Sequence, residues 1–276
     1  MAAIPDRTAR GDARAAIARV PSWYHTIEVA PGVVTPGAFD LRGIVGRLPW
    51  PEVRGKRCLD VGTYDGFLAF ELEKRGAAEV VAADLPGYDD WDWELHQRDR
   101  GPDYMRHVAG PVLGAGARLA RELLGSSVTF ERVSVYELDP DALGTFDVVV
   151  CGSLLLHLRD PLRALAAIRG VCTGHFLSTN AVELGLSLLH PRRPLFRLDG
   201  TSGVTQWWLA NRAGNRQLLR AGGFEVLEES RLYSEPFGPG HARRSRRPRW
   251  LLPSLGRIAL TGREGVPHQA LLARPA

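Results

Sequence analysis

Residues 58–94 read CLDVGTYDGFLAFELEKRGAAEVVAADLPGYDDWDWE, and this stretch decides the fold. It begins with a short apolar run and a glycine-containing turn, continues with a helical pattern, and then has a second apolar run that stops at an acidic residue. This order predicts a strand, a turn, a helix and a second strand, the unit with which α/β proteins hold nucleotides.

The same alternation continues along the chain and predicts a parallel sheet with helices on both faces. The expected helices span about 66–75, 103–124, 160–170 and 212–222. The expected strands are 57–61, 79–84, 128–133, 146–152, 174–180, 224–230 and 269–274. No helical pattern separates the last two, so one strand near the edge is expected to run antiparallel. The prediction is therefore a doubly wound, seven-stranded, mostly parallel α/β sheet.

Outside this core, turn-forming and aromatic residues predict a lid or cap over residues 1–50. Residues 51–276 are expected to form the main domain, with insertions at 181–211 and 231–268. A chain of 276 residues allows one such α/β domain with additions.

Composition points to a cytoplasmic protein with no membrane partner. No apolar run approaches the ~20 residues of a membrane span, and residues 1–20 lack the apolar segment of a secretory signal. Cys58 and Cys151 lie within apolar strand-like runs and are expected to be buried, reduced thiols. A net charge of +4 is too mild to indicate nucleic-acid binding by itself.

The turn after the first strand distinguishes between two kinds of nucleotide. A dinucleotide fingerprint reads G-x-G-x-x-G, whereas Gly62 and Gly66 are separated by three residues and Tyr64 replaces the middle glycine. Asp60 and Asp65 flank the turn, and two carboxylates there would repel a pyrophosphate. S-adenosylmethionine carries an ammonium group and a sulfonium, which carboxylates attract, so it is favoured over NAD as the cofactor.

At this point the sequence resembles the class I S-adenosylmethionine-dependent methyltransferases, near the branch of the tRNA wobble-uridine (carboxy)methyltransferases. The resemblance rests on DVGTYDG at 60–66, AD at 83–84 and FDVVVCGSLLLHLRDP at 146–161. WYHTIEVAPGVVTPGAFDLRG at 23–43 and WWLANRAGNRQLLRAGGFEVL at 207–227 are similar to flanking segments of that branch. Leu156 stands where the wobble-uridine enzymes commonly have tyrosine, and the N-terminal segment has no lysine to pair with a carboxylated cofactor, so ordinary methyl transfer is expected.

The resemblance implies a set of cofactor-binding residues at the carboxyl ends of the strands. They are Asp60, Gly62, Thr63, Tyr64 and Gly66 in the turn, Asp84 at the ribose, Leu85, Val135 and Tyr136 at the adenine, and Ser153 beside the sulfonium. Alternative roles remain open for some of them: Asp84 as a turn cap, Leu85 and Tyr136 as packing residues. Asp65 is either a helix N-cap or a cofactor contact.

Four residues are candidates for catalysis. His157 follows the fourth strand and is the candidate general base, its alternative being a packing role with a backbone hydrogen bond. Asn180 ends the fifth strand, where polar groups orient acceptors. Tyr24 and His25 are expected to come from the lid, unless they only pack it. The acidic and amide set of a metal-dependent transferase is incomplete, so no metal is expected.

Two acceptor classes compete. In the first, a small molecule such as a natural product or a sugar is O-methylated, with Trp91, Trp93, Trp207 and Trp208 either walling its pocket or packing in the core. In the second, RNA binds the arginine cluster at 243–249, whose alternative is a solvated loop. The small molecule is favoured because RNA-modifying members of the resembled branch have a larger N-terminal extension, whereas only about 50 residues precede the core here. A non-catalytic cofactor-binding subunit is the third possibility.

Overall fold

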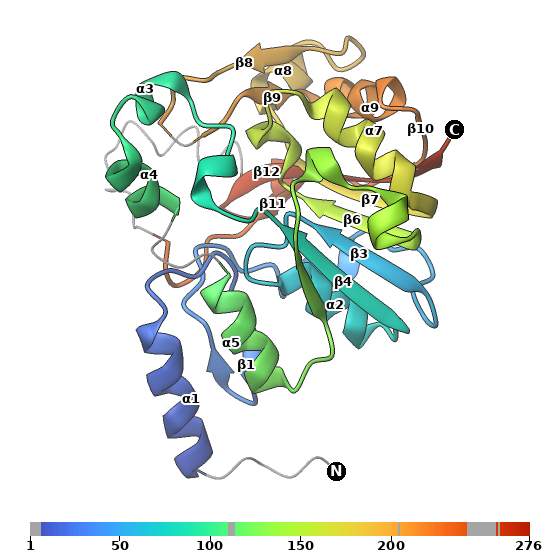
Figure 1. The fold of residues 1–276 in the computed structure, drawn as a ribbon. Helices are drawn as coiled ribbons and strands as arrows, with labels where there is room; N and C mark the ends of the chain where they lie inside the picture. The colour runs from blue at the N-terminus through green and yellow to red at the C-terminus, as the bar shows by residue number, and fades with distance from the viewer. Residues whose placement is uncertain (1–6, 110–113, 204, 242–257, 259) are drawn as a thin grey trace.

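A central sheet organises the computed structural model, which describes residues 7–109, 114–203, 205–241, 258 and 260–276 (Figure 1). Its strand order is β10-β12-β7-β6-β3-β4-β5, and a short strand β11 pairs with β12. The bounds are β3 Arg57–Val61, β4 Glu79–Asp84, β5 Thr129–Arg132, β6 Phe146–Gly152, β7 Cys172–Ala181, β10 Phe224–Glu229, β11 Tyr233–Glu235 and β12 Val266–Pro275. The seven predicted strands are all present.

Strand direction follows the prediction as well. β5, β4, β3, β6 and β7 pair in parallel, while β12 pairs antiparallel with both β7 and β10. β11 is the element that the sequence pattern did not reveal, because it has only three residues. It pairs with the beginning of β12 and brings residues 233–235 to the carboxyl end of β7.

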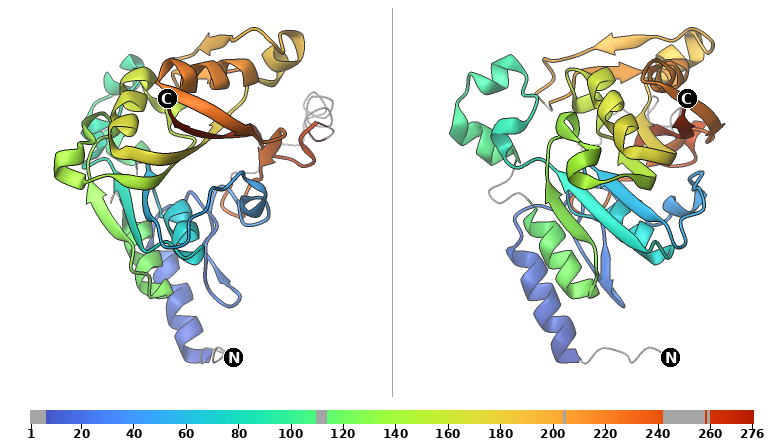
Figure 2. Two further views of the ribbon diagram at one scale, coloured as in Figure 1. Left: turned by 90° about the vertical axis from the view of Figure 1, so that its right-hand side faces the viewer. Right: turned by 45° about the vertical axis from the view of Figure 1, so that its right-hand side comes forward.

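The two faces of the sheet are covered by different helices (Figure 2). One face packs against α1 (Arg7–Arg19), α2 (Phe67–Lys74) and α5 (Ala115–Leu124), and the other against α7 (Pro161–Val171) and α9 (Arg212–Ala221). Neighbouring positions of one strand supply both layers: Cys58 belongs to the first core and Leu59 to the second. This alternation is the period of two that a parallel sheet buried on both faces requires.

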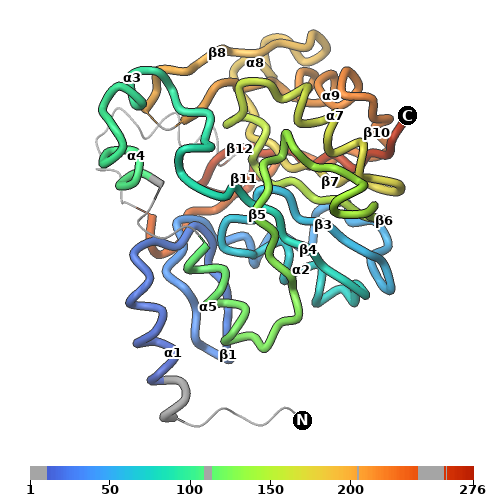
Figure 3. Tube along the Cα trace, viewed as in Figure 1, coloured from blue at the N-terminus to red at the C-terminus, as the bar shows by residue number. Residues whose placement is uncertain are grey.

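The N-terminal segment contributes to the core. Trp23, Ile27, Val29 and Leu41 are all buried in the cluster that includes α2. Between them lie the short strands β1 (Glu28–Ala30) and β2 (Val33–Val34), and the 3-10 helix η1 (Val45–Arg47) follows. In the tube of Figure 3 this segment runs beside α5. The predicted cap over residues 1–50 thus also contributes side chains to the hydrophobic core.

The prediction of one helix over 103–124 is wrong, because the structure has two helices in this range. α4 spans Pro102–Ala109 and α5 begins at Ala115, after Gly114 in the left-handed conformation with φ 68°. The 3-10 helix η2 (Tyr88–Asp90) and α3 (Leu95–Arg98) precede α4. α3 and α4 pack on each other at one side of the molecule.

Both predicted insertions have local structure. Residues 181–211 contain α8 (Leu184–Leu189) and the antiparallel pair β8 (Phe196–Leu198) and β9 (Trp208–Ala210). The insertion 231–268 contains β11, but the arginine cluster at 243–249 lies outside the described residues. Two further 3-10 helices, η3 (Val135–Glu137) and η4 (Leu155–His157), and the short α6 (Pro140–Leu143) complete the fold.

Cys58, Cys151 and Cys172 are buried and unpaired, as expected of Cys58 and Cys151. Within the described ranges, no helix is both long and apolar enough to cross a membrane.

Candidate active site

The turn between β3 and α2 is held open by backbone conformation. Gly62 and Gly66 have φ values of 74° and 90°, and Tyr64, at the position of the missing glycine, has a φ of 53°. A side chain in the left-handed region costs free energy unless its surroundings hold it there. The Tyr64 N–H donates a 2.7 Å hydrogen bond to Asp84 Oδ2, which holds it. The turn thus keeps the left-handed conformation typical of glycine although residue 64 is a tyrosine.

Asp84 connects this turn to the loop after β4. Its Oδ1 accepts a 2.8 Å hydrogen bond from the Leu85 N–H, while Oδ2 accepts the bond from Tyr64. Burial raises the pKa of Asp84, and the two backbone N–H groups oppose that rise. Each oxygen keeps a second lone pair for a hydroxyl group.

A narrow cleft, here called the β4 cleft, lies at the carboxyl ends of β3, β4 and β5. It is lined by Val61, Gly62, Ala83, Asp84, Leu85, Asp90, Asp92, Val133, Ser134, Val135, Tyr136, Leu154 and Leu158. A Cβ atom on Gly62 would lie 3.0 Å from Leu154 Cδ2, so glycine keeps the cleft free at that point. The Tyr136 hydroxyl donates to Asp92, which fixes the ring along the wall. Asp84 and Leu85 also line a neighbouring cavity of about 450 Å³.

A second, small space, here called the turn cavity, shares Gly62 with the β4 cleft. It is lined by Tyr24, His25, Leu41, Asp60, Gly62, Thr63, Leu68, Gly152, Ser153, Thr179 and Glu235. Asp60 accepts hydrogen bonds from the Thr63 hydroxyl at 2.7 Å and from the Ala69 N–H at 3.1 Å. Burial raises the pKa of Asp60 to about 7, against the lowering effects of Thr63 and the His25 charge.

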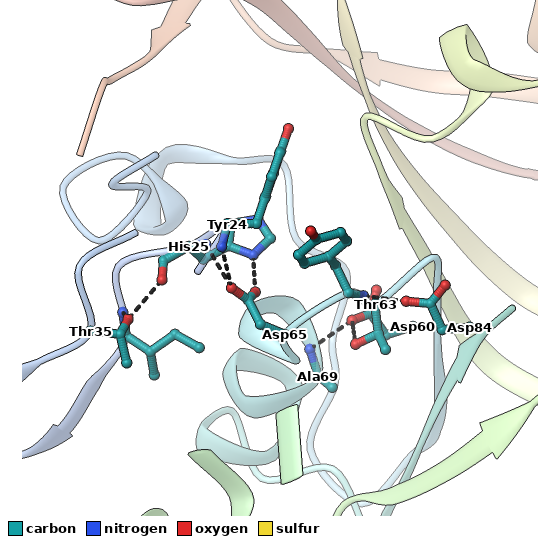
Figure 4. A network of polar contacts seen from close by, with 10 residues as sticks. Tyr24, His25, Thr35, Asp60, Thr63, Asp65, Ala69 and Asp84 are labelled. Atoms are coloured by element: carbon teal, nitrogen blue, oxygen red, sulfur yellow. Dashed lines mark hydrogen bonds and ion pairs between the residues drawn. The ribbon is translucent and has the colours of Figure 1, made fainter. Parts of the chain in front are cut away.

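Asp65 ties the N-terminal segment to the turn (Figure 4). Its Oδ2 accepts the N–H groups of Tyr24 and His25 at 2.8 and 2.7 Å, and its Oδ1 contacts His25 Nδ1. Burial lowers the pKa of His25, but the charge of Asp65 and its hydrogen bond raise it more, so the net pKa is raised. Gly66 holds the N-cap position of α2, so the N-cap alternative for Asp65 is corrected. Asp65 also lines the cavity of about 450 Å³ beside Tyr64 and Asp84, and its contact with a cofactor stays a prediction.

A third space of about 820 Å³, here called the large cavity, opens next to the turn cavity. It is lined by Tyr24, Phe39, Ser153, Leu156, His157, Ala181, Val182, Glu183, Leu184, Arg197, Gln206, Leu209, Glu235, Val266, Pro267 and His268. Its walls combine apolar side chains with a few polar groups, the composition typical of small-molecule sites.

His157 is placed in the large cavity with a defined tautomer. Its Nδ1 lies 2.7 Å from the carbonyl oxygen of Thr205, which can only accept a hydrogen bond, so Nδ1 carries the proton. Burial lowers the pKa of His157, and the Thr205 hydrogen bond opposes this only in part. The imidazole is thus neutral near pH 7, and Nε2 is a free acceptor.

Three residues line both the turn cavity and the large cavity: Tyr24, Ser153 and Glu235. We call this place the junction. Ser153 has a φ of 50°, and its hydroxyl oxygen lies 2.8 Å from His268 Nε2. Tyr64, Ser153 and Thr205 are the described non-glycine residues with positive φ, and each belongs to the turn, the junction or the partner of His157. Such strain is typical of functional sites.

The chain resembles known methyltransferases over part of its length, although no protein-family model matches it. The ubiquinone biosynthesis O-methyltransferase of Hahella chejuensis is 32% identical over 113 residues, 41% of this chain and 37% of the relative. The enzyme of the same name from Pseudomonas aeruginosa is 25% identical over 166 residues, 58% of each chain. The chain thus spans between about a third and three fifths of the length of these relatives.

Among solved structures, the N-terminal domain of EvdMO1, crystallised in the presence of SAH and D-fucose, covers 97% of both chains. Its sequence identity is 17% and its TM-score is 0.52. The chain has the class I methyltransferase fold. The curated relatives above come from ubiquinone biosynthesis rather than from the tRNA wobble-uridine branch, so that closer placement stays a resemblance.

Most of the candidate residues line one of the spaces described above. Asp84, Leu85, Val135 and Tyr136 line the β4 cleft, and Asp60, Gly62 and Thr63 line the turn cavity. Tyr64 lines the neighbouring cavity, and Gly66 lies at the N-cap of α2. His25 borders the turn cavity, whereas Tyr24 and Ser153 reach the junction.

Asn180 is not at the site. It is buried in β7 opposite Gln269 of β12, and its Nδ2 donates to Ser178 Oγ at 2.9 Å. Neighbouring residues of a strand point to opposite faces, and Thr179 is the one that lines the turn cavity. The expected acceptor contact of Asn180 is therefore corrected.

The four tryptophans also lie away from the large cavity. Trp91 stacks on Trp93 with ring centroids 5.1 Å apart, and Trp207 Nε1 donates to the Asp92 carbonyl at 2.7 Å. Trp208 Nε1 donates to the Arg159 carbonyl at 3.3 Å. Together they fasten residues 88–99 to residues 159 and 205–208, which is the packing alternative.

No sequence motif predicted Glu235 and His268. Both are buried and line the large cavity, with His268 Nε2 3.3 Å from Glu235 Oε2. Their only signal in the sequence is a polar residue near the start of an apolar strand and an acidic residue directly before PFGPG, and neither forms a strand-end motif. In the part of the chain that the structure describes, no group of three or more His, Cys, Asp and Glu residues could hold a metal ion.

Proposed function

We propose that the protein transfers the methyl group of S-adenosylmethionine to a hydroxyl group of a small molecule held in the large cavity. The observation that carries this proposal is that neighbouring spaces share lining residues. Gly62 is common to the β4 cleft and the turn cavity, and Tyr24, Ser153 and Glu235 are common to the turn cavity and the large cavity. A cofactor bound along the β4 cleft, with its methionine part toward the turn cavity, would have its reactive end near the junction.

The residues present fit this cofactor. Asp84 offers one free lone pair on each oxygen for the two ribose hydroxyls, and Leu85, Val135 and Tyr136 offer a slot for the adenine. The buried carboxyl group of Asp60 and the hydroxyl of Thr63 border the turn cavity, where an ammonium group would lie. When bound, S-adenosylmethionine supplies an electrophilic methyl group on a sulfonium.

The large cavity supplies the acceptor site. Its free imidazole nitrogen, His157 Nε2, accepts a hydrogen bond from the acceptor hydroxyl and takes its proton as the new C–O bond forms. Alignment of the hydroxyl with the methyl group supplies further acceleration, since in-line transfer depends on geometry. We propose that Tyr24 and Ser153 border the path of the methyl group, and that His25 positions Tyr24 through Asp65.

The names of the curated relatives support O-methylation in particular, since each is an O-methyltransferase. We propose by the same argument that residues 1–50 act as the cap of the site, because Tyr24, His25 and Leu41 border the turn cavity. RNA is the alternative acceptor, and a cofactor-binding subunit without activity is the third possibility.

The test is methyl transfer from methyl-labelled S-adenosylmethionine by the purified protein into two pools from the source cell, total tRNA and the small-metabolite fraction. We expect label in the small-metabolite fraction, with His157→Ala as the matched control that leaves it unlabelled. Label in tRNA alone would move the acceptor to RNA. Cofactor binding without label in either pool would favour the non-catalytic subunit.

A further inference from the structure

A buried carboxylate, that of Glu235, lies at the junction without a lysine or arginine partner among the described residues. Glu235 is 4% exposed and lies at the end of β11. Among the described residues, no lysine or arginine forms an ion pair with it, and its one charged neighbour at ion-pair distance is His268. Ser153 Oγ lies 3.4 Å from Glu235 Oε1. A buried carboxylate without a permanent counter-charge is costly, so its position needs an explanation.

The ring of His268 is fixed by contacts on both sides. His268 is 2% exposed, and its Nδ1 lies 2.9 Å from the Val266 carbonyl oxygen, which can only accept, so Nδ1 carries a proton. Its Nε2 lies 2.8 Å from Ser153 Oγ and 3.3 Å from Glu235 Oε2. A histidine is a cation only in its protonated form, so among the described residues Glu235 has no permanently charged partner at ion-pair distance.

The chemistry of the reaction supplies a cation at that place. During transfer the bond between the methyl carbon and sulfur breaks, its electron pair stays on sulfur, and the acceptor oxygen bonds the methyl group. The cofactor thereby changes from a sulfonium cation to the neutral thioether S-adenosylhomocysteine. A carboxylate beside the sulfur atom favours the first over the second, and burial makes this charge interaction stronger than it would be in water.

We propose that Glu235 is the counter-charge of the cofactor's sulfonium, held in place by Ser153 and His268. This inference rests on the proposed function. Its consequence is that the protein prefers the charged cofactor to the neutral product, so that fresh cofactor displaces S-adenosylhomocysteine after each turnover.

Isothermal titration calorimetry tests this with three ligands: S-adenosylmethionine, S-adenosylhomocysteine and sinefungin, in which a protonated amine replaces the sulfonium. We expect Glu235→Gln to weaken binding of the two cationic ligands by about tenfold or more, and to change binding of S-adenosylhomocysteine by less than about twofold. Glu183→Gln is the matched control, because Glu183 lines the large cavity but not the turn cavity, and it should leave all three affinities unchanged. An equal loss for all three ligands in Glu235→Gln, or no loss, would overturn the proposal.

The unaltered protein gives a second test that does not depend on how the variant folds. It should bind S-adenosylmethionine and sinefungin at least about threefold more tightly than S-adenosylhomocysteine. A preference for the neutral product would contradict the role of Glu235. If the unaltered protein binds none of the three ligands, the proposed function itself fails, and this outcome is distinct from an altered ratio.

Discussion

The β4 cleft and the large cavity are built in different ways. The cleft takes most of its residues from the ends of β3 and β4 and the short turns after them, within residues 61–92 and 133–136. The large cavity collects its lining from residues between Tyr24 and His268, including the N-terminal segment, η4, the 181–211 insertion, β11 and β12. The first is a local structure on consecutive elements, whereas the second exists only when the whole chain is folded.

The two regions are also expected to have different roles, one in cofactor affinity and the other in turnover. Residues of the β4 cleft are held by backbone hydrogen bonds, as Asp84 is by Tyr64 and Leu85, so they serve a ligand of fixed shape. Residues of the large cavity are held by partners far away in the sequence, as His157 is by the Thr205 carbonyl and Ser153 by the side chain of His268. We therefore expect substitutions in the cleft to change cofactor affinity, and substitutions in the large cavity to change turnover.

The largest expected effect is on turnover in His157→Ala. Loss of the neutral imidazole should lower kcat by about 10²–10⁴-fold, the range for a general base. The affinity for S-adenosylmethionine, measured by calorimetry, should stay within about twofold, because His157 lines the large cavity and not the other two spaces. His190→Ala, at an exposed histidine, is the control and should retain full activity. A comparable loss of cofactor affinity would show that the two sites are not separate.

A smaller effect, on affinity, is expected for Asp84→Ala. The variant removes a carboxylate that would bind the ribose and that also holds the Tyr64 turn, so the Kd for S-adenosylmethionine should rise by about 10- to 100-fold. Asp89→Asn, at an exposed carboxylate in the following loop, should bind normally. If Asp84→Ala kept its affinity, the assignment of the β4 cleft to the cofactor would be wrong.

The smallest expected effect concerns the link between the two regions, the pair formed by His25 and Asp65. The pKa of His25 in the folded state is raised above 6.5, so its contribution to stability is complete below pH 6.5 and is lost as the pH rises through the folded-state pKa. Between pH 6 and pH 8.5 the free energy of unfolding should fall by about 1 kcal/mol more in the unaltered protein than in His25→Asn.

Urea unfolding at the two pH values measures this difference, and Asp65→Asn should remove it as well. The same pH dependence in all three proteins would mean that the N-terminal segment is joined to the turn by its backbone hydrogen bonds alone.

Most of the sheet could be predicted because its strands are buried on both faces and appear as short apolar runs between turns. The bounds of β3, β4 and β6 agree with the prediction residue for residue. The helix over 103–124 was wrong because the helical periodicity of α4 and α5 is similar on both sides of Gly114, and a single glycine is a weak breaker in a sequence. β11 was not predicted because a strand of three residues is too short to show the alternation of side chains typical of a strand.

The residues of the site also fall into a group that local motifs predict and a group that they do not. The predicted residues of the β4 cleft follow from short motifs after β3, β4 and β5, since strand ends and turns determine where they lie. Asn180 was misplaced because a shift of one residue moves a side chain to the other face of a strand. Glu235 and His268 depend on the pairing of β11 with β12, a contact that no local pattern specifies.

One side chain, that of Asn211, joins several parts of the 181–211 insertion by hydrogen bonds. Asn211 Nδ2 donates to the carbonyl oxygens of His190 and Arg193, and its Oδ1 accepts from the N–H groups of Leu195 and Gly214. The insertion is thus a module with its ends near Val182 and Asn211. It forms part of the wall of the large cavity and of neither of the other two spaces. Exchange of this module between related chains would therefore change the wall of the large cavity without replacing a residue that lines the β4 cleft or the turn cavity.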